Sequence, residues 1–235
     1  MAPGLRRAAS SGPEAENRVV VSVTNAIREF RLRPGARLVE REIALNSGAS
    51  RSAVRNGLLR LAQSGLVELS PNRGATIATC SPKEARDVFE ARRVVETAVI
   101  RRLVQMATPE LIARLLSLVE DERQAYGARR IAQARQLSRE FHLLLAELAD
   151  NAALTGFLKD LIEKQPLLSW SDERGRACFC GNAAHAGIVA AIACADADAA
   201  VERNARHLDE LEHMLIVERE AGAAAFAAAP KGAAP

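Results

Sequence analysis

Aromatic residues are scarce in this 235-residue sequence, at 3% of the chain with a single tryptophan and a single tyrosine. Large β-sandwiches are enriched in aromatic and β-branched side chains, so this composition argues against that class. Alanine, leucine, arginine and glutamate are abundant, and all four favour helices or tolerate them well. Hydrophobic residues at 49% and charged residues at 26% are typical of a folded globular protein. We therefore predict a mainly α-helical fold.

Three further features are sparse or missing. The four cysteines are too few and too unevenly spaced for a disulfide framework, which favours the cytoplasm. The longest uncharged stretch, residues 177–195, contains Asn182, His185 and two glycines, so we do not expect a membrane helix there. No apolar run follows Arg6 and Arg7, so we expect no secretory signal. Together these features predict a cytoplasmic protein without a membrane segment.

Positive charge is concentrated in the first third of the chain. Residues 1–80 contain 12 arginines, no lysine and six glutamates, a net charge of +6, whereas residues 81–235 carry a net charge of −3. A basic segment next to an acidic one suggests a part that binds a polyanion and a second part with another role. The alternative is that surface arginines cluster by chance.

The chain divides into two blocks between ends that lack hydrophobic periodicity. We expect a disordered arm over residues 1–13 and a disordered alanine-rich tail over residues 221–235. A β-hairpin predicted over 66–79 precedes a helix-start signature at Ser81-Pro-Lys-Glu, so we place one domain at residues 14–80. Helix starts and breaks predict an antiparallel bundle of six or seven helices over residues 81–220.

The first block has the element order of a winged helix-turn-helix. Apolar periodicity predicts helices near residues 18–31, 39–47 and 51–64, and the hairpin after them serves as the wing. The third helix presents Arg51, Ser52 and Arg55 away from its apolar stripe, which suits the DNA major groove. An arginine there can donate two hydrogen bonds to a guanine.

Two more arginines flank this helix. We expect Arg41 on the second helix and Arg73 at the tip of the wing to hold phosphates or enter a minor groove. The alternative is that these arginines only solubilise a small helical domain.

Four segments of the first block resemble the DNA-binding domain of GntR-family bacterial transcription regulators. They begin at Arg33-Pro-Gly-Ala-Arg-Leu-Val-Glu-Arg-Glu, Gly48-Ala-Ser-Arg-Ser, Leu58-Leu-Arg-Leu and Pro71-Asn-Arg-Gly. The resemblance covers about residues 18–79 and implies that the DNA contacts include Arg41, Ser50, Arg51, Ser52, Arg55 and Gly74. One departure is Asn56-Gly57, where the family usually has Glu-Ala. A glycine inside a helix costs about 1 kcal/mol relative to alanine, so Gly57 is expected to weaken the third helix.

Histidine is the informative residue of the second block. His142, His185 and His207 each share an apolar helical stripe, whereas His213 lies among charged residues and is expected to be exposed. Three inward histidines on three helices of one bundle predict a site for a divalent cation, because neutral imidazoles bind such ions. The alternative is that each is an ordinary hydrogen-bonded core residue.

The second block resembles the FCD ligand-binding domain of the FadR subfamily of these regulators. The resemblance runs through Val88–Glu96, Phe141-His142 and the stretch from His185 to His207. In that family an aspartate four residues before the first histidine joins three histidines around a metal, and small carboxylic acids complete the coordination. The resemblance implies Zn or Ni on His142, His185 and His207, but Ser138 stands at the aspartate position. A metal-free pocket whose histidines bind an anionic effector is the alternative.

The expected effector contacts are Arg92, Ser138 and Asn204. For Arg92 the alternative is an intrahelical ion pair with Glu96. The expected function is therefore that of a transcription regulator, most simply a repressor, and not of an enzyme. It binds a palindromic operator as a homodimer, through apolar faces within 88–104 and 111–119, and senses a small organic acid.

Two other functions stay open. One is a metal-dependent, hydrolase-like enzyme with a three-histidine site, although only Ser138 and Asn204 are polar on the histidine stripes. The other is a DNA-binding protein whose effector pocket has decayed.

Overall fold

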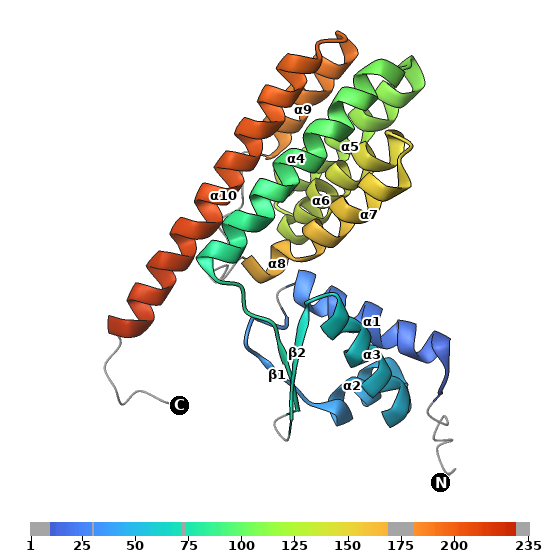
Figure 1. Ribbon diagram of the computed structural model, residues 1–235, viewed down its shortest axis with the longest axis vertical. Helices are drawn as coiled ribbons and strands as arrows, with labels where there is room; N and C mark the ends of the chain where they lie inside the picture. Colours follow the sequence, from blue (N-terminus) through green and yellow to red (C-terminus); the bar gives the residue numbers. More distant parts are fainter. Residues whose placement is uncertain (1–9, 30, 72–73, 169–180, 229–235) are drawn as a thin grey trace. The chain divides into compact units, whose positions relative to one another are not determined.

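The computed structural model describes residues 10–29, 31–71, 74–168 and 181–228, and it divides into two compact units at the Cys80–Ser81 peptide (Figure 1). Helices dominate both units, which confirms the mainly α-helical fold class predicted from composition. Within the described residues no helix is long and apolar enough to cross a membrane.

The first unit packs three helices beside a small sheet. Its third helix begins at Arg51 because Ser50, in extended conformation, accepts a hydrogen bond from the backbone N–H of Ala53. Gly48 ends the second helix in the left-handed region, at φ 63°, and so makes the tight turn between the two. The elements in order are α1 (Pro13–Arg28), β1 (Arg37–Leu38), α2 (Glu40–Ser47), α3 (Arg51–Gln63), β2 (Val67–Ser70) and β3 (Gly74–Ile77).

The predicted hairpin is present as β2 and β3, paired antiparallel with Leu69 opposite Ala75. A third strand, β1, pairs antiparallel with β3 on its other side and was not predicted. It consists of Arg37 and Leu38 only, which is too short to show an alternating pattern. The winged helix-turn-helix element order is thus the observed one.

Described structure extends into both ends of the chain for which we expected disorder. Ser10 forms a parallel bridge with Ala49: its N–H donates to the Gly48 carbonyl at 3.1 Å, and its carbonyl accepts from the Ser50 N–H at 2.7 Å. At the other end the last helix continues to Ala228, because an alanine-rich segment has high helix propensity despite lacking an amphipathic pattern. Residues 1–9 and 229–235 lie outside the described residues.

Gly57 allows α1 and α3 to approach closely. It is buried in the middle of α3, and a Cβ atom built on it would lie 2.6 Å from Val19 Cγ1 and 2.8 Å from Val19 Cβ. Val19 is itself fully buried on α1 and, being β-branched, has little freedom to move aside. The prediction that Gly57 weakens this helix therefore considered helix propensity alone and omitted a packing requirement.

We expect Gly57→Ala to destabilise the protein although alanine is the better helix former. Overlap in a packed interior costs about 1–3 kcal/mol, more than the gain of about 1 kcal/mol in propensity. Gly156→Ala on α7 (Ala152–Glu163) is the matched control, since a Cβ there meets nothing within 4 Å and should stabilise the helix. Scanning calorimetry measures both changes. A Gly57→Ala protein as stable as the parent would contradict the packing argument.

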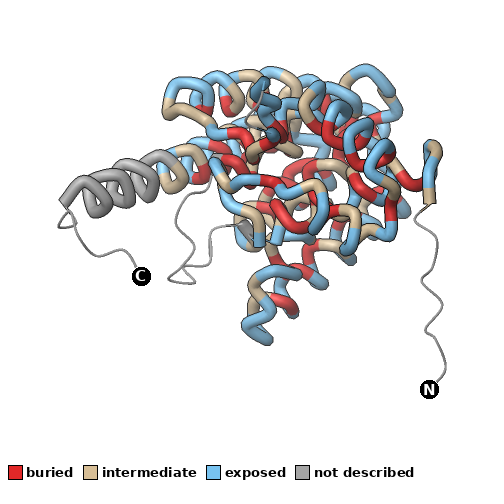
Figure 2. Tube along the Cα trace, turned by 90° about the horizontal axis from the view of Figure 1, so that it is seen from below, coloured by how far each residue is buried: buried red, intermediate tan, exposed pale blue. Residues whose placement is uncertain are grey.

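The second unit is an antiparallel helical bundle, as predicted. Its first helix starts at a complete capping box, in which Ser81 accepts from the Glu84 N–H and Glu84 accepts from the Ser81 N–H. Buried positions recur along the inward sides of its helices, with exposed positions on the outer turns (Figure 2). The elements are α4 (Pro82–Met106), α5 (Pro109–Gly127), α6 (Ile131–Leu148), α7 (Ala152–Glu163), α8 (Gln165–Leu168), α9 (Gly181–Ala193) and α10 (Ala197–Ala228).

The core of this bundle is aliphatic with few aromatic rings, as the composition requires. Side chains from α4, α5, α6, α7, α9 and the start of α10 form one cluster, which includes Leu103, Leu115, Leu145 and Ile192. Each of these four is at most 1% exposed. The same unit also buries several polar and charged side chains, which is where a site can be built.

Candidate functional site

The outward face of α3 carries three of the seven residues predicted to contact DNA, and Ser50 caps the start of this helix. Arg51, Ser52 and Arg55 are exposed, while Val54 and Leu58 on the opposite side are buried. The hydroxyl oxygens of Ser50 and Ser52 lie 2.9 Å apart at the start of the helix. The start of α3 thus presents two hydroxyls and an arginine at a helix N-terminus, an arrangement that suits a phosphate.

The other predicted DNA contacts have mixed outcomes. Arg41 is exposed on α2. Gly74 opens β3 with φ 85°, a conformation that glycine adopts without strain. Arg73 lies outside the described residues. Within the described part of this unit, the recorded partner of Arg55 is Glu40 on α2, whose two carboxylate oxygens accept from Nε at 3.3 Å and 3.2 Å.

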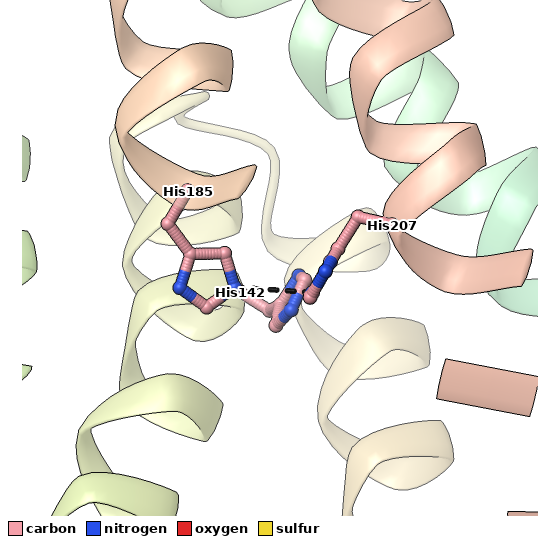
Figure 3. Close-up of side chains that lie close together, drawn as sticks. All are labelled: His142, His185 and His207. Atoms are coloured by element: carbon pink, nitrogen blue, oxygen red, sulfur yellow. Dashed lines mark hydrogen bonds between the residues drawn. The ribbon is translucent and has the colours of Figure 1, made fainter. Parts of the chain in front are cut away.

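The second unit brings its three inward histidines together. His142 on α6, His185 on α9 and His207 on α10 are each at most 2% exposed, and one ring nitrogen of each lies within 4.8 Å of the others. Their rings converge from three helices (Figure 3). Nε2 of His185 and Nε2 of His207 are 3.1 Å apart. His213, by contrast, is exposed on α10, as predicted.

Two buried glutamates fix the orientation of two of these rings. Nδ1 of His142 lies 2.9 Å from a carboxylate oxygen of Glu96, and Nδ1 of His185 lies 2.8 Å from one of Glu122. A carboxylate only accepts hydrogen bonds, so each Nδ1 carries the proton and donates it. The lone pair is then on Nε2 of each ring, on the side that faces the other histidines.

Burial and neighbouring charges favour the neutral form of two of the imidazoles, those of His142 and His207. Burial lowers the pKa of His142 to about 4, with the Arg92 guanidinium acting in the same direction and Glu96 opposing it. Burial likewise lowers the pKa of His207 well below its usual range, helped by the two other histidines. For Glu96, burial opposes ionisation, but Arg92 and His142 outweigh it and hold the carboxyl pKa well below its usual range.

Arg92 makes the predicted ion pair and still has a donor without a partner. Its Nε donates to Glu96 at 2.8 Å and its Nη1 donates to Gln165 at 3.3 Å, but Nη2 has no partner among the described residues. The side chain is fully buried on α4. The two interpretations of Arg92, intrahelical ion pair and contact for an anion, are therefore compatible.

Buried polar atoms without partners gather around the histidines. Among the described residues they include Nε2 of His142, Nδ1 of His207, Oε1 of Glu122 and Oδ1 of Asn204. Asn204 lies on α10 one turn before His207, and Ser138 lies half-buried on α6 one turn before His142. Buried polar atoms usually have hydrogen-bond partners, so a cluster of unsatisfied ones points to a bound ion or ligand.

The donor set fits a divalent cation of the zinc or nickel type. Three imidazoles each bring a ring nitrogen to the site, and carboxylates accept from Nδ1 of two of them, as is common for histidine ligands of metals. A hydroxyl from Ser138 is a poor replacement for a carboxylate ligand, so three histidines leave a coordination position open.

The sequence interpretation missed Glu122 and gave Glu96 only the role of an ion-pair partner. The helical spacing along α5 indicates that Glu122 is buried. Leu111, Leu115 and Val119 face inward, and Glu122 lies on the same stripe. Glu96 likewise follows Phe89 and Arg92 on the inward face of α4. A carboxylate on an apolar stripe needs a buried partner, and the inward histidines were available.

Two family models match the chain. One is described as the FCD domain and covers residues 87–210; the other is described as bacterial regulatory proteins, gntR family, and covers residues 15–77. The solved structure of Escherichia coli McbR/YncC matches with a TM-score of 0.77 over 88% of this chain and 100% of that chain. Its sequence identity is 18%, so this likeness shows the fold alone.

Two curated relatives are regulators. The HTH-type transcriptional repressor RspR of Escherichia coli strain K12 is 31% identical over 117 residues, 50% of this chain and 51% of the relative, so the chain spans about half the length of that relative. The Nta operon transcriptional regulator of Aminobacter aminovorans is 27% identical over 147 residues, 63% of this chain and 70% of that protein. The matched families and relatives are regulators and not enzymes, so the hydrolase alternative has no support.

Proposed function

The chain belongs to the GntR family of bacterial regulatory proteins, with an FCD domain as its second part, and from this premise we propose that it is a cytoplasmic repressor released from DNA by a small carboxylate. The observation that carries the proposal is a buried site of three histidines and Arg92, whose Nη2 has no hydrogen-bond partner among the described residues. Such a site serves a small anion, while the basic first unit serves DNA.

The DNA contacts are assigned to the first unit. Arg51, Ser52 and Arg55 on α3 enter the major groove, and Ser50, Arg41, Arg73 and Gly74 contact the backbone around it. The exposed face of α3 and the net charge of +6 over residues 1–80 support this assignment.

The effector site is assigned to the second unit. A divalent cation such as Zn or Ni, when bound, would be held by His142, His185 and His207 and would offer an open position to a carboxylate. Nη2 of Arg92 donates to the same carboxylate or to a second one, and Oδ1 of Asn204 accepts from a hydroxyl or amine of the effector. Ser138, half-buried on α6 one turn before His142, is assigned to the same effector site.

A homodimer on a palindromic operator follows from the size of the DNA-reading surface. One recognition helix buries too little area for operator-level affinity, so two copies are needed. Val94 on α4, at 68% exposed, and Leu116 on α5, at 49%, are large apolar side chains on the predicted contact stretches 88–104 and 111–119, which supports dimerisation through them.

The test is DNA affinity in the presence of small carboxylates. Duplexes selected by the purified protein from a random library serve as the operator, and fluorescence anisotropy reports binding with and without zinc. We expect at least one small hydroxy- or dicarboxylate to weaken DNA binding by about 5- to 150-fold, the usual size of such coupling. The matched carboxamide of that acid should have no effect. A protein that ignores every acid in both conditions would instead be the DNA-binding protein with a decayed pocket.

A further inference from the structure

Glu40 and Arg55 join the two helices of the helix-turn-helix on the side predicted to face DNA. Glu40 is the first residue of α2, and both of its carboxylate oxygens accept from Arg55 Nε on α3, at 3.3 Å and 3.2 Å. The two side chains are 41% and 68% exposed. Exposed ion pairs of this kind contribute little to stability, so the main consequence of this one is the direction in which the guanidinium points.

The contact uses only one of the five N–H groups of Arg55. Among the described residues, no hydrogen bond is recorded from its Nη1 or Nη2 atoms. With Nε engaged, the guanidinium can meet a partner only end-on, through those two atoms. Guanine presents O6 and N7 in the major groove as a pair of acceptors that matches this fork.

The negative charge of Glu40 also makes a guanine base a more favourable partner for Arg55 than a phosphate. A phosphate that approaches Arg55 would come near the Glu40 carboxylate and be repelled, whereas the edge of a guanine carries no net charge. The other exposed arginines of this surface, Arg41 and Arg51, have no acidic partner recorded among the described residues and remain available to phosphates or bases.

We infer that Glu40 is a positioning residue for sequence reading. Its carboxylate holds Arg55 so that Nη1 and Nη2 meet O6 and N7 of one guanine in each half of the operator, and it disfavours contact of Arg55 with a phosphate. The inference rests on the proposed DNA binding. It means that Glu40 on α2 controls the base preference of Arg55 on α3.

The test compares DNA sequences selected from a random duplex library by the parent protein and by variants. The parent is expected to select a guanine at one position, and Arg55→Lys should lose that guanine preference. Lysine cannot donate the two parallel hydrogen bonds that a guanidinium donates to a guanine. Glu40→Ala should weaken the preference at that same position by about 5- to 100-fold and leave the other positions unchanged. Glu40→Gln keeps an amide oxygen that accepts from Nε and should restore part of the preference.

Glu42→Ala is the matched control, because Glu42 is an exposed glutamate of the same helix with no recorded contact to Arg55. Both alanine variants remove one negative charge, so both should bind non-specific duplex more tightly than the parent does. Only Glu40→Ala should steepen the dependence of log affinity on log salt, by about 0.9 per subunit, because its Arg55 turns to a phosphate.

Three results overturn the inference: a guanine preference that survives in Glu40→Ala, a loss that is equal at all positions, or an equal loss in Glu42→Ala. The parent could select a defined sequence in which no guanine preference is lost on Arg55→Lys. The inference about Glu40 then fails, while the proposed DNA binding stands. If the parent enriches no sequence at all, the proposed function fails first and the inference with it.

Discussion

Reversing the charge of Arg51 and Arg55 together should lower the affinity for the selected duplex by at least about 100-fold, since each arginine that forks to a guanine contributes about 1–3 kcal/mol of discrimination. Both residues are exposed on the outward face of α3, where glutamates would face the phosphates. The fold should survive, because an acidic residue at position 51 sits favourably at a helix N-terminus.

The control for this experiment is a second double reversal with the same change in net charge. Arg86 on α4 and Arg114 on α5 are exposed, with no recorded partner among the described residues. Arg86→Glu with Arg114→Glu should weaken DNA binding by less than about 10-fold, because both residues belong to the second unit and not to the predicted DNA-binding unit, and salt screens exposed charges. Anisotropy titrations at one salt concentration measure both proteins. Equal losses in the two variants would mean that α3 does not read DNA.

The sequence predicted the first unit well because its signals are local. The Ser50 cap, the Gly48 turn and the alternating hairpin strands each depend on residues within a few positions of one another. β1 escaped prediction because a two-residue strand exists only through its pairing with β3, which is distant in sequence. The packing role of Gly57 was missed for the same reason, since its close neighbour Val19 lies on another helix.

The helical unit could be predicted only in part. Helical register placed His142, His185 and His207 on inward faces, and the structure brings them within 4.8 Å. Register does not say which inward residues meet at the same depth of a bundle, so the pairing of Glu96 with His142 and of Glu122 with His185 required the structure. That Nη2 of Arg92 has no partner among the described residues depends on packing and has no sequence signal.

Removing one imidazole should abolish tight zinc binding by the second unit. In the proposed site each histidine supplies one ligand, and no other histidine, cysteine or acidic residue joins the cluster within the described residues. Mutating a residue that orients a ligand typically costs 10–100-fold in metal affinity, and losing the ligand itself costs more. We therefore expect His185→Ala to lower zinc affinity by more than about 100-fold, measured by competition with a chromogenic chelator.

Replacing Glu122, whose carboxylate pairs with His185, should cause a smaller loss of zinc affinity than removing the histidine. Glu122→Gln keeps the size of the side chain and an acceptor oxygen for Nδ1 of His185, at 2.8 Å in the parent, but removes the charge. Zinc affinity should fall by about 10-fold, because a neutral acceptor orients the ring and raises its basicity less. His213→Ala is the matched control on the exposed side of α10 and should bind zinc like the parent. If the parent holds zinc no better than His185→Ala, the buried histidines serve the anion directly, and Arg92 is then the residue whose loss should remove the response to carboxylates.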